Sequence, residues 1–175
     1  QDLSSLRGET ARRIRRKVQY IFQDSYAALS PRQKVGRAVE EAMIISGERN
    51  ATSRRKKCIA SFDRVGLSFD TLDPFPRQLP GRQRQRVVIA RALVVDPQVL
   101  ICDEPVSALD ISIRAQIMNL LLKLQRENGL SYLFISHDLS IVRQAAQRVY
   151  VMYLGRIVET AASAELYAQP GHPYT

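Results

Sequence analysis

The spacing of apolar positions predicts alternating strands and helices along most of the chain. The clearest helix, over 112–128, has apolar residues every three or four positions: Ile113, Ile117, Leu120, Leu121 and Leu124. Asn128-Gly129 ends it. Further helices are predicted over 83–95 and 139–147. Short apolar runs predict strands at 17–23, 99–102, 131–135, 149–153 and 156–159. This order predicts an α/β fold whose parallel strands are joined by right-handed crossovers.

The segment between the first two predicted strands has a different residue pattern. From Ser25 to Pro80, proline and glycine interrupt short helical stretches, such as 35–45 and 53–65. We interpret residues 25–80 as a small helical subdomain. It is inserted into an α/β core made of residues 1–24 and 81–175.

Composition narrows the class of protein. The apolar content of 45% and charged content of 25% are ordinary for a globular domain. No apolar run approaches the roughly 20 residues of a membrane span, and no signal-peptide pattern opens the chain. The two cysteines, Cys58 and Cys102, have no metal-binding spacing, which favours a reducing compartment, the cytoplasm.

The net charge of +9 is concentrated in arginine and lysine clusters at 12–17, 54–57 and 82–86. Such clusters favour anionic partners, namely nucleotides, nucleic acid or lipid headgroups. The alternative is an ordinary solvated surface.

Adjacent carboxylates follow the apolar strand 99–102. In open α/β sheets, ligands bind at the carboxyl ends of the strands, where Asp103 and Glu104 would lie. Neighbouring strand residues point to opposite sides, so one carboxylate can hold Mg²⁺ while the other faces an attacking water. The alternative is a solvent-exposed acidic pair that ends a strand.

Two more polar side chains follow predicted strands. Gln23 could ligate a metal or orient water, or it could cap the turn at Asp24-Ser25. His137 follows strand 131–135 and would reach the same sheet edge, where it could donate a hydrogen bond to a γ-phosphate. A structural role is the alternative for His137, and Asp138 is a good N-cap for the next helix.

Two further segments precede predicted helices. A loop that leads into a helix N-terminus suits a phosphate, and one such loop consists of Leu79, Pro80, Gly81, Arg82 and Gln83. A simple Pro/Gly helix start explains it equally well. Asp110, taken locally, is a helix N-cap.

Together, in order and spacing, these segments resemble an ABC-type ATPase. They are most similar to the ATP-binding subunits of oligopeptide, dipeptide, nickel or glutathione importers. The matching segments are 20–24 (Q-loop), 79–93 (signature motif and its helix), 100–104 (Walker B), 107–110 (D-loop) and 135–138 (switch-histidine loop). The final tetrapeptide, His172–Thr175, narrows the resemblance to peptide-type importers.

The resemblance implies a P-loop NTPase, RecA-like core with ATP and Mg²⁺ as cofactors. It implies that Asp103 holds Mg²⁺, mostly through water, and that Glu104 is the general base. It also implies that Gln23 contacts Mg²⁺ and water, that His137 contacts the γ-phosphate, and that Asp110 communicates across a dimer.

The same resemblance implies partners and a location. The signature loop would contact the nucleotide on a second ATPase subunit, identical or homologous. Permease subunits would hold the chain at the cytoplasmic face of the membrane, and would connect it indirectly to a solute-binding protein. No nucleic acid is implied.

Two departures from the family pattern change these expectations. The chain contains no Gly-Lys dipeptide and hence no Walker A motif, GxxxxGK[ST]. The opening residues 1–6 read like the interior of a domain, so we expect a piece of a longer nucleotide-binding domain that binds ATP weakly by itself. The family signature Leu-Ser-Gly-Gly-Gln is replaced by Leu79-Pro80-Gly81-Arg82-Gln83.

The sequence also supports two other interpretations of the function. The two departures favour a non-catalytic remnant or regulatory partner. The positive charge favours a nucleic-acid-associated ABC ATPase, against which stand the final tetrapeptide and the lack of any coiled-coil insertion.

Overall fold

The computed structural model describes residues 5–175, so most of the opening segment that we interpreted as the interior of a domain lies outside the described residues. The chain divides into two compact units, one up to Leu133 and one over Phe134–Thr175. In chain order the α-helices and strands are α1 (Gly8–Lys17), β1 (Val18–Ile21), α2 (Val35–Ile45), α3 (Ala51–Arg64), α4 (Gly81–Leu93), β2 (Val99–Asp103), α5 (Ile111–Asn128), β3 (Ser131–Ile135), α6 (Leu139–Ala145), β4 (Arg148–Tyr153), β5 (Arg156–Ala162) and α7 (Ser163–Ala168).

The first sheet has the order β1-β2-β3, and β1 runs parallel to β2. Their register pairs Val18 with Val99 and Ile21 with Cys102. Leu100 and Cys102 are fully buried, while the residues that alternate with them along β2 are only partly buried. The predicted apolar strand therefore buries one face fully, as the two-residue period of a strand allows.

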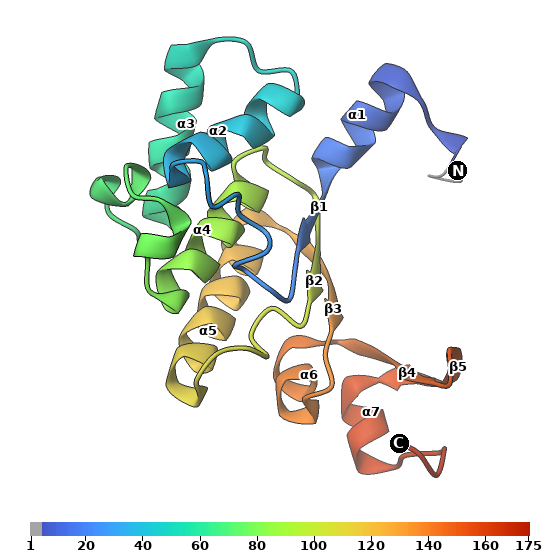
Figure 1. Ribbon diagram of the computed structural model, residues 1–175. Coiled ribbons are helices and arrows are strands. Elements are labelled where there is room, and N and C mark those ends of the chain that lie inside the picture. The colour runs from blue at the N-terminus through green and yellow to red at the C-terminus, as the bar shows by residue number, and fades with distance from the viewer. Residues whose placement is uncertain (1–4) are drawn as a thin grey trace. The chain divides into compact units, whose positions relative to one another are not determined.

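Helices cover the buried face of this sheet. In Figure 1, α4 and α5 lie on one side of β1 and β2, and α2 and α3 lie beyond α4. α4 contacts α2, α3, α5 and β1, so it is the central helix of the first unit. Most of its apolar residues, from Val87 to Leu93, are buried.

The α/β fold prediction is confirmed, and the helix predicted over 35–45 has the same bounds as α2. α4 begins at Gly81, two residues earlier than predicted. The first basic cluster, at 12–17, lies entirely on α1, a helix that the apolar pattern did not predict. None of the helices in the described part of the chain is long and apolar enough to cross a membrane.

The second unit corrects one expectation. β4 does not continue a series of parallel strands but pairs antiparallel with β5 in a separate sheet. A Leu154-Gly155 turn joins them, with φ of 47° and 76°. Both values are positive, as in the two-residue turns whose twist suits antiparallel strands. A connection this short cannot join parallel strands, which need a crossover.

Candidate active site

The parallel register of β1 and β2 brings Gln23 to Glu104. Ile21 is level with Cys102, and Gln23 and Glu104 each lie two residues beyond that pair. Gln23 Nε2 donates a hydrogen bond of 2.8 Å to Glu104 Oε2. The neighbouring turn is held by a different residue, since Asp24 Oδ1 accepts hydrogen bonds from the backbone N–H groups of Tyr26 and Ala27. Gln23 therefore does not serve as the turn cap.

Asp103 has a separate partner. The Tyr20 hydroxyl donates to Asp103 Oδ2 at 2.5 Å, diagonally across the two strands. The protonated phenol donates this hydrogen bond, which is the main cause of the raised pKa of Tyr20. The Tyr20 ring also lies 4.5 Å, centroid to centroid, from the ring of Phe22. The local sequence pattern gave no signal for Tyr20, because it lies within the apolar run that predicts the strand.

Glu104 leaves the strand with an unusual backbone. Its φ is 44°, in the left-handed region that residues other than glycine rarely adopt. Its carbonyl accepts hydrogen bonds from the backbone N–H of Ser107 at 3.2 Å and from the Ser107 hydroxyl at 3.1 Å. The turn therefore begins at Glu104. The change of backbone direction there points the Glu104 side chain differently from that of Asp103.

A buried glutamine connects this turn to α4. Gln85 is only 2% exposed, and its Nε2 donates to the Pro105 carbonyl at 2.7 Å. Sequence reasoning missed Gln85. The available signal was its position on the apolar side of a helix, four residues before Ile89, where a polar side chain needs a buried partner.

The predicted phosphate loop forms the start of α4. Pro80 is the N-cap residue, with no side-chain cap, and its carbonyl accepts from the N–H groups of Gln83 and Arg84 at 3.0 Å each. Leu79 is buried and Arg82 is exposed. Consequently the N–H groups of Gly81 and Arg82 are the donors that this helix end can offer to an anion.

Asp110 is at the N-cap position of α5, as the local reading predicted, but its side chain makes no capping hydrogen bond. Its carboxylate is exposed. The position therefore supports the helix through its backbone, and the side chain remains available for a contact outside the chain.

His137 belongs to the second unit, two residues beyond the end of β3. It is exposed. Asp138 caps α6, accepting from the N–H groups of Ser140 at 3.0 Å and Ile141 at 3.4 Å. The geometry that joins Gln23, Asp103 and Glu104 is defined within the first unit alone.

The chemistry of these side chains fits a hydrated magnesium ion. Tyr20 occupies one Asp103 oxygen and Gln23 donates through its amide nitrogen, so Asp103 Oδ1 and the Gln23 amide oxygen can face a cation or a water. No cluster of three or more potential ligands among His, Cys, Asp and Glu exists within residues 5–175. Mg²⁺ suits such a site, because it is commonly held by one or two carboxylates together with water and substrate phosphates.

Comparison with known proteins places these segments in context. The family model for ABC transporters matches residues 1–107. The dipeptide transport ATP-binding protein DppF of Haemophilus influenzae is 49% identical over 167 residues, covering 95% of this chain and 51% of that protein. DppF of Escherichia coli is 47% identical over 175 residues, covering 100% of this chain and 52% of that protein. The chain thus spans about half the length of these relatives.

Solved structures share the fold. CbiO1 from Clostridium perfringens, part of the ABC transporter complex CbiONQ, superposes with a TM-score of 0.81 at 29% identity, covering 93% of this chain and 64% of that one. A dimeric ATP-binding cassette in a post-hydrolysis state, bound to ADP and Pi, has a TM-score of 0.76 at 30% identity. That superposition covers 91% of this chain and 68% of the other.

Proposed function

This chain belongs to the ABC transporter family, and we propose that it supplies the hydrolytic edge of an ATP-binding subunit that drives the import of peptides or similar small solutes. The observation that carries the proposal is the hydrogen bond of 2.8 Å between Gln23 and Glu104, beside Asp103, at the carboxyl ends of parallel strands. The similarity to two dipeptide transport ATP-binding proteins supports the solute class.

Glu104 is the general base in this proposal. Gln23 orients the Glu104 carboxylate through its hydrogen bond, and a carboxylate held at this edge can accept a proton from an attacking water. Asp103, fixed by Tyr20, is the residue that would hold Mg²⁺. When bound, the cation neutralises charge on the phosphate oxygens.

The signature loop and Asp110 act between subunits, whereas His137 acts on the nucleotide directly. The N–H groups of Gly81 and Arg82 face the nucleotide of a second ATPase subunit, and Leu79, Pro80 and Gln83 shape that loop. Asp110, whose side chain makes no cap, contacts the same partner. His137 donates a hydrogen bond to the γ-phosphate.

Permease subunits would hold the protein at the cytoplasmic face of the membrane. The part of the chain over 25–80, which contains α2 and α3, is the proposed contact with them, and 1–24 and 81–175 are the proposed core. A solute-binding protein takes part only through the permease.

The test removes the proposed base from the chain assembled with its partner subunit and permease. Glu104→Gln keeps the shape and the capacity to accept from Gln23, but it cannot take a proton. We expect ATP hydrolysis to fall by about a hundredfold or more, with little change in ATP affinity. Glu127→Gln, an exposed carboxylate on α5, is the control. Equal hydrolysis by both variants would refute the role of Glu104.

A non-catalytic subunit is the second candidate, because two specific features favour it. Pro80 and Arg82 alter the signature loop, and the chain has no Gly-Lys dipeptide. In this case ATP hydrolysis would reside in the partner subunit and Glu104→Gln would leave it unchanged. The gene sequence upstream of Gln1 separates the candidates, since a GxxxxGK[ST] segment in frame restores the enzyme.

A further inference from the structure

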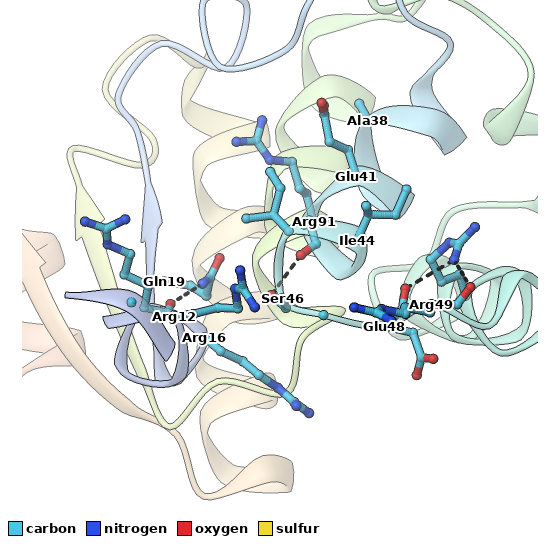
Figure 2. A pocket seen from close by; sticks show the side chains of 16 residues that line it. Arg12, Arg16, Gln19, Ala38, Glu41, Ile44, Ser46, Glu48, Arg49 and Arg91 are labelled. Atoms are coloured by element: carbon cyan, nitrogen blue, oxygen red, sulfur yellow. Dashed lines mark hydrogen bonds between the residues drawn. The ribbon is translucent and has the colours of Figure 1, made fainter. Parts of the chain in front are cut away.

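A cavity of about 920 Å³ lies at the amino-terminal end of β1. It is lined by residues of α1, α2, the following loop over 46–49, the start of α3 and the end of α4 (Figure 2). Gln19, the second residue of β1, lines it, whereas Gln23 follows the opposite end of that strand. The cavity is therefore separate from the proposed hydrolytic edge.

Arginine dominates the lining. Six arginines and two glutamates contribute to it; the arginines are Arg12, Arg15, Arg16, Arg49, Arg54 and Arg91. Figure 2 shows Arg12 and Arg16 on the side of α1, and Glu48 and Arg49 on the side of the loop after α2. Segments far apart in the sequence thus supply the positive charge.

Backbone carbonyls hold three of these guanidinium groups. Arg16 Nε donates to the Val95 carbonyl at 3.1 Å, and Arg91 donates to the Ala28 carbonyl. Arg54 donates to the carbonyls of Glu48 and Arg49, at 3.1 and 2.7 Å. A carbonyl fixes a guanidinium group without cancelling its charge, so these arginines are positioned and remain cationic.

One of the two glutamates of the lining, Glu48, already has partners of its own. Glu48 accepts from the backbone N–H of Asn50 at 3.2 Å and the Ser53 hydroxyl at 3.1 Å, and Lys57 lies 3.4 Å away. These contacts, that of Asn50 foremost, lower the pKa of Glu48. Its negative charge therefore already has a cationic partner in Lys57, which does not line this cavity.

Most of the arginines lack an acidic partner. Arg12 pairs with Glu9 at 2.9 Å. For the other five, no carboxylate of the described residues lies within ion-pair distance. The Nε of Arg54 is buried and has no hydrogen-bond partner in the described part of the chain.

The lining also has an apolar part. Ile44 and Ile45 are 40% and 67% exposed, and Ala38 and Ala42 contribute to the same wall. The volume is that of a small-molecule site, about 300–1,000 Å³. The cavity thus combines fixed positive charge with a limited apolar surface.

We propose that this cavity binds a phosphate-bearing anion, as a site distinct from the ATP-hydrolysing edge. The arginines of the lining come from α1, the loop after α2, α3 and α4, so four segments contribute positive charge to one cavity. A phosphate group, with three or more acceptor oxygens in a tetrahedral arrangement, can serve several such donors at once, whereas a carboxylate has two oxygens in one plane. The source is a soluble phosphate or an acidic lipid headgroup, which share this chemistry.

The experiment titrates the full chain with pyrophosphate by calorimetry, in buffer with EDTA so that the acidic edge holds no cation. Arg15 and Arg49 are exposed, and among the described residues their side chains make no hydrogen bond or ion pair, so Arg15→Gln with Arg49→Gln removes charge without removing structural contacts. We expect binding at least about tenfold weaker in this double variant. Arg13→Gln with Arg32→Gln removes the same charge at exposed positions outside the cavity and should change affinity less than about twofold.

A second arm identifies the source of the phosphate. Sedimentation with vesicles of phosphatidylglycerol, against phosphatidylcholine, tests the lipid. If the chain sediments with phosphatidylglycerol vesicles, and the cavity double variant loses this binding while the control double variant keeps it, the ligand is a lipid headgroup. If the chain binds pyrophosphate but not the vesicles, the ligand is a soluble phosphate. Either result supports the proposal. The proposal is overturned by an absence of saturable binding, by equal losses in both double variants, or by binding of an oligoglutamate peptide but not of pyrophosphate. None of these outcomes bears on Glu104.

Discussion

Gln23 and Gln85 hold the Glu104 turn from two sides. Gln23 donates to the Glu104 carboxylate and Gln85 to the Pro105 carbonyl, at 2.8 and 2.7 Å. Glu104 itself has a positive φ of 44°. A backbone in a sparsely populated region persists only where surrounding contacts determine it. These two amides are such contacts, so they position the proposed base through its side chain and through its backbone.

Gln85→Leu tests this at the residue scale. The substitution removes the donor and leaves the buried Pro105 carbonyl without a partner. We expect the free energy of unfolding, measured by urea denaturation, to fall by about 1–3 kcal/mol. Gln116→Leu, at an exposed position of α5, should change it by less than about 0.5 kcal/mol. Similar values for the two variants would argue against a structural role of the Gln85 hydrogen bond.

At the scale of single elements, the start of α4 differs most from the family pattern. Pro80 has neither a hydroxyl nor an N–H group where a serine offers both. Arg82 adds a long side chain where glycine lets the backbone approach a phosphate closely. α4 nevertheless forms, because proline is well tolerated at a helix start and the Pro80 carbonyl accepts from Gln83 and Arg84.

Pro80→Ser with Arg82→Gly should restore the missing donors and the close approach. Each hydrogen bond to a charged oxygen contributes roughly 1.5–3 kcal/mol. ATP hydrolysis by the assembled transporter should therefore rise by about ten- to a hundredfold or more. Pro80→Ala, which returns the N–H without the hydroxyl, separates the two contributions. An unchanged rate in the double variant would show that this loop does not limit hydrolysis.

At the scale of the whole molecule, the 175 residues contain the proposed catalytic side chains but not the motif that binds the β- and γ-phosphates. The proposed hydrolytic edge has two carboxylates and an amide, whereas no Gly-Lys dipeptide exists to supply a lysine beside the β- and γ-phosphates. We expect the 175-residue chain alone to bind Mg-ATP with a Kd weaker than about 10 µM. Calorimetric titration measures it, and a tighter Kd would contradict the expectation.

The buried thiols make stability depend on pH. Burial raises the pKa of Cys58 and of Cys102 from 9.0 to about 12. It raises the pKa of the Tyr132 hydroxyl as well. The folded chain thus favours the protonated groups. Their stabilising contribution is complete below the pKa of the unfolded thiol, and it is lost progressively as the pH rises from there through the folded pKa.

The urea midpoint should consequently decrease between about pH 8 and about pH 10. Cys102→Ala, compared with the unchanged chain, should show a smaller decrease, because one of the two buried thiols no longer titrates. A midpoint that is constant over this range would contradict the assignment of buried, protonated thiols.

The sequence by itself determined the order and type of most elements. Apolar periodicity operates over a few residues, so it located α2, α5 and the strands without knowledge of their neighbours. The order of polar segments was specific enough to indicate the family, and the family model and the superposed structures agree with it.

Only the tertiary structure decided which distant residues meet. The register of β1 on β2 sets Gln23 against Glu104 across 81 positions, and no local pattern encodes a register. The pairing of β4 with β5 and the arginine-lined cavity likewise depend on how separate segments pack. Periodicity reports which face of an element is buried, whereas pairing and cavities arise from long-range contacts that form only in the folded chain.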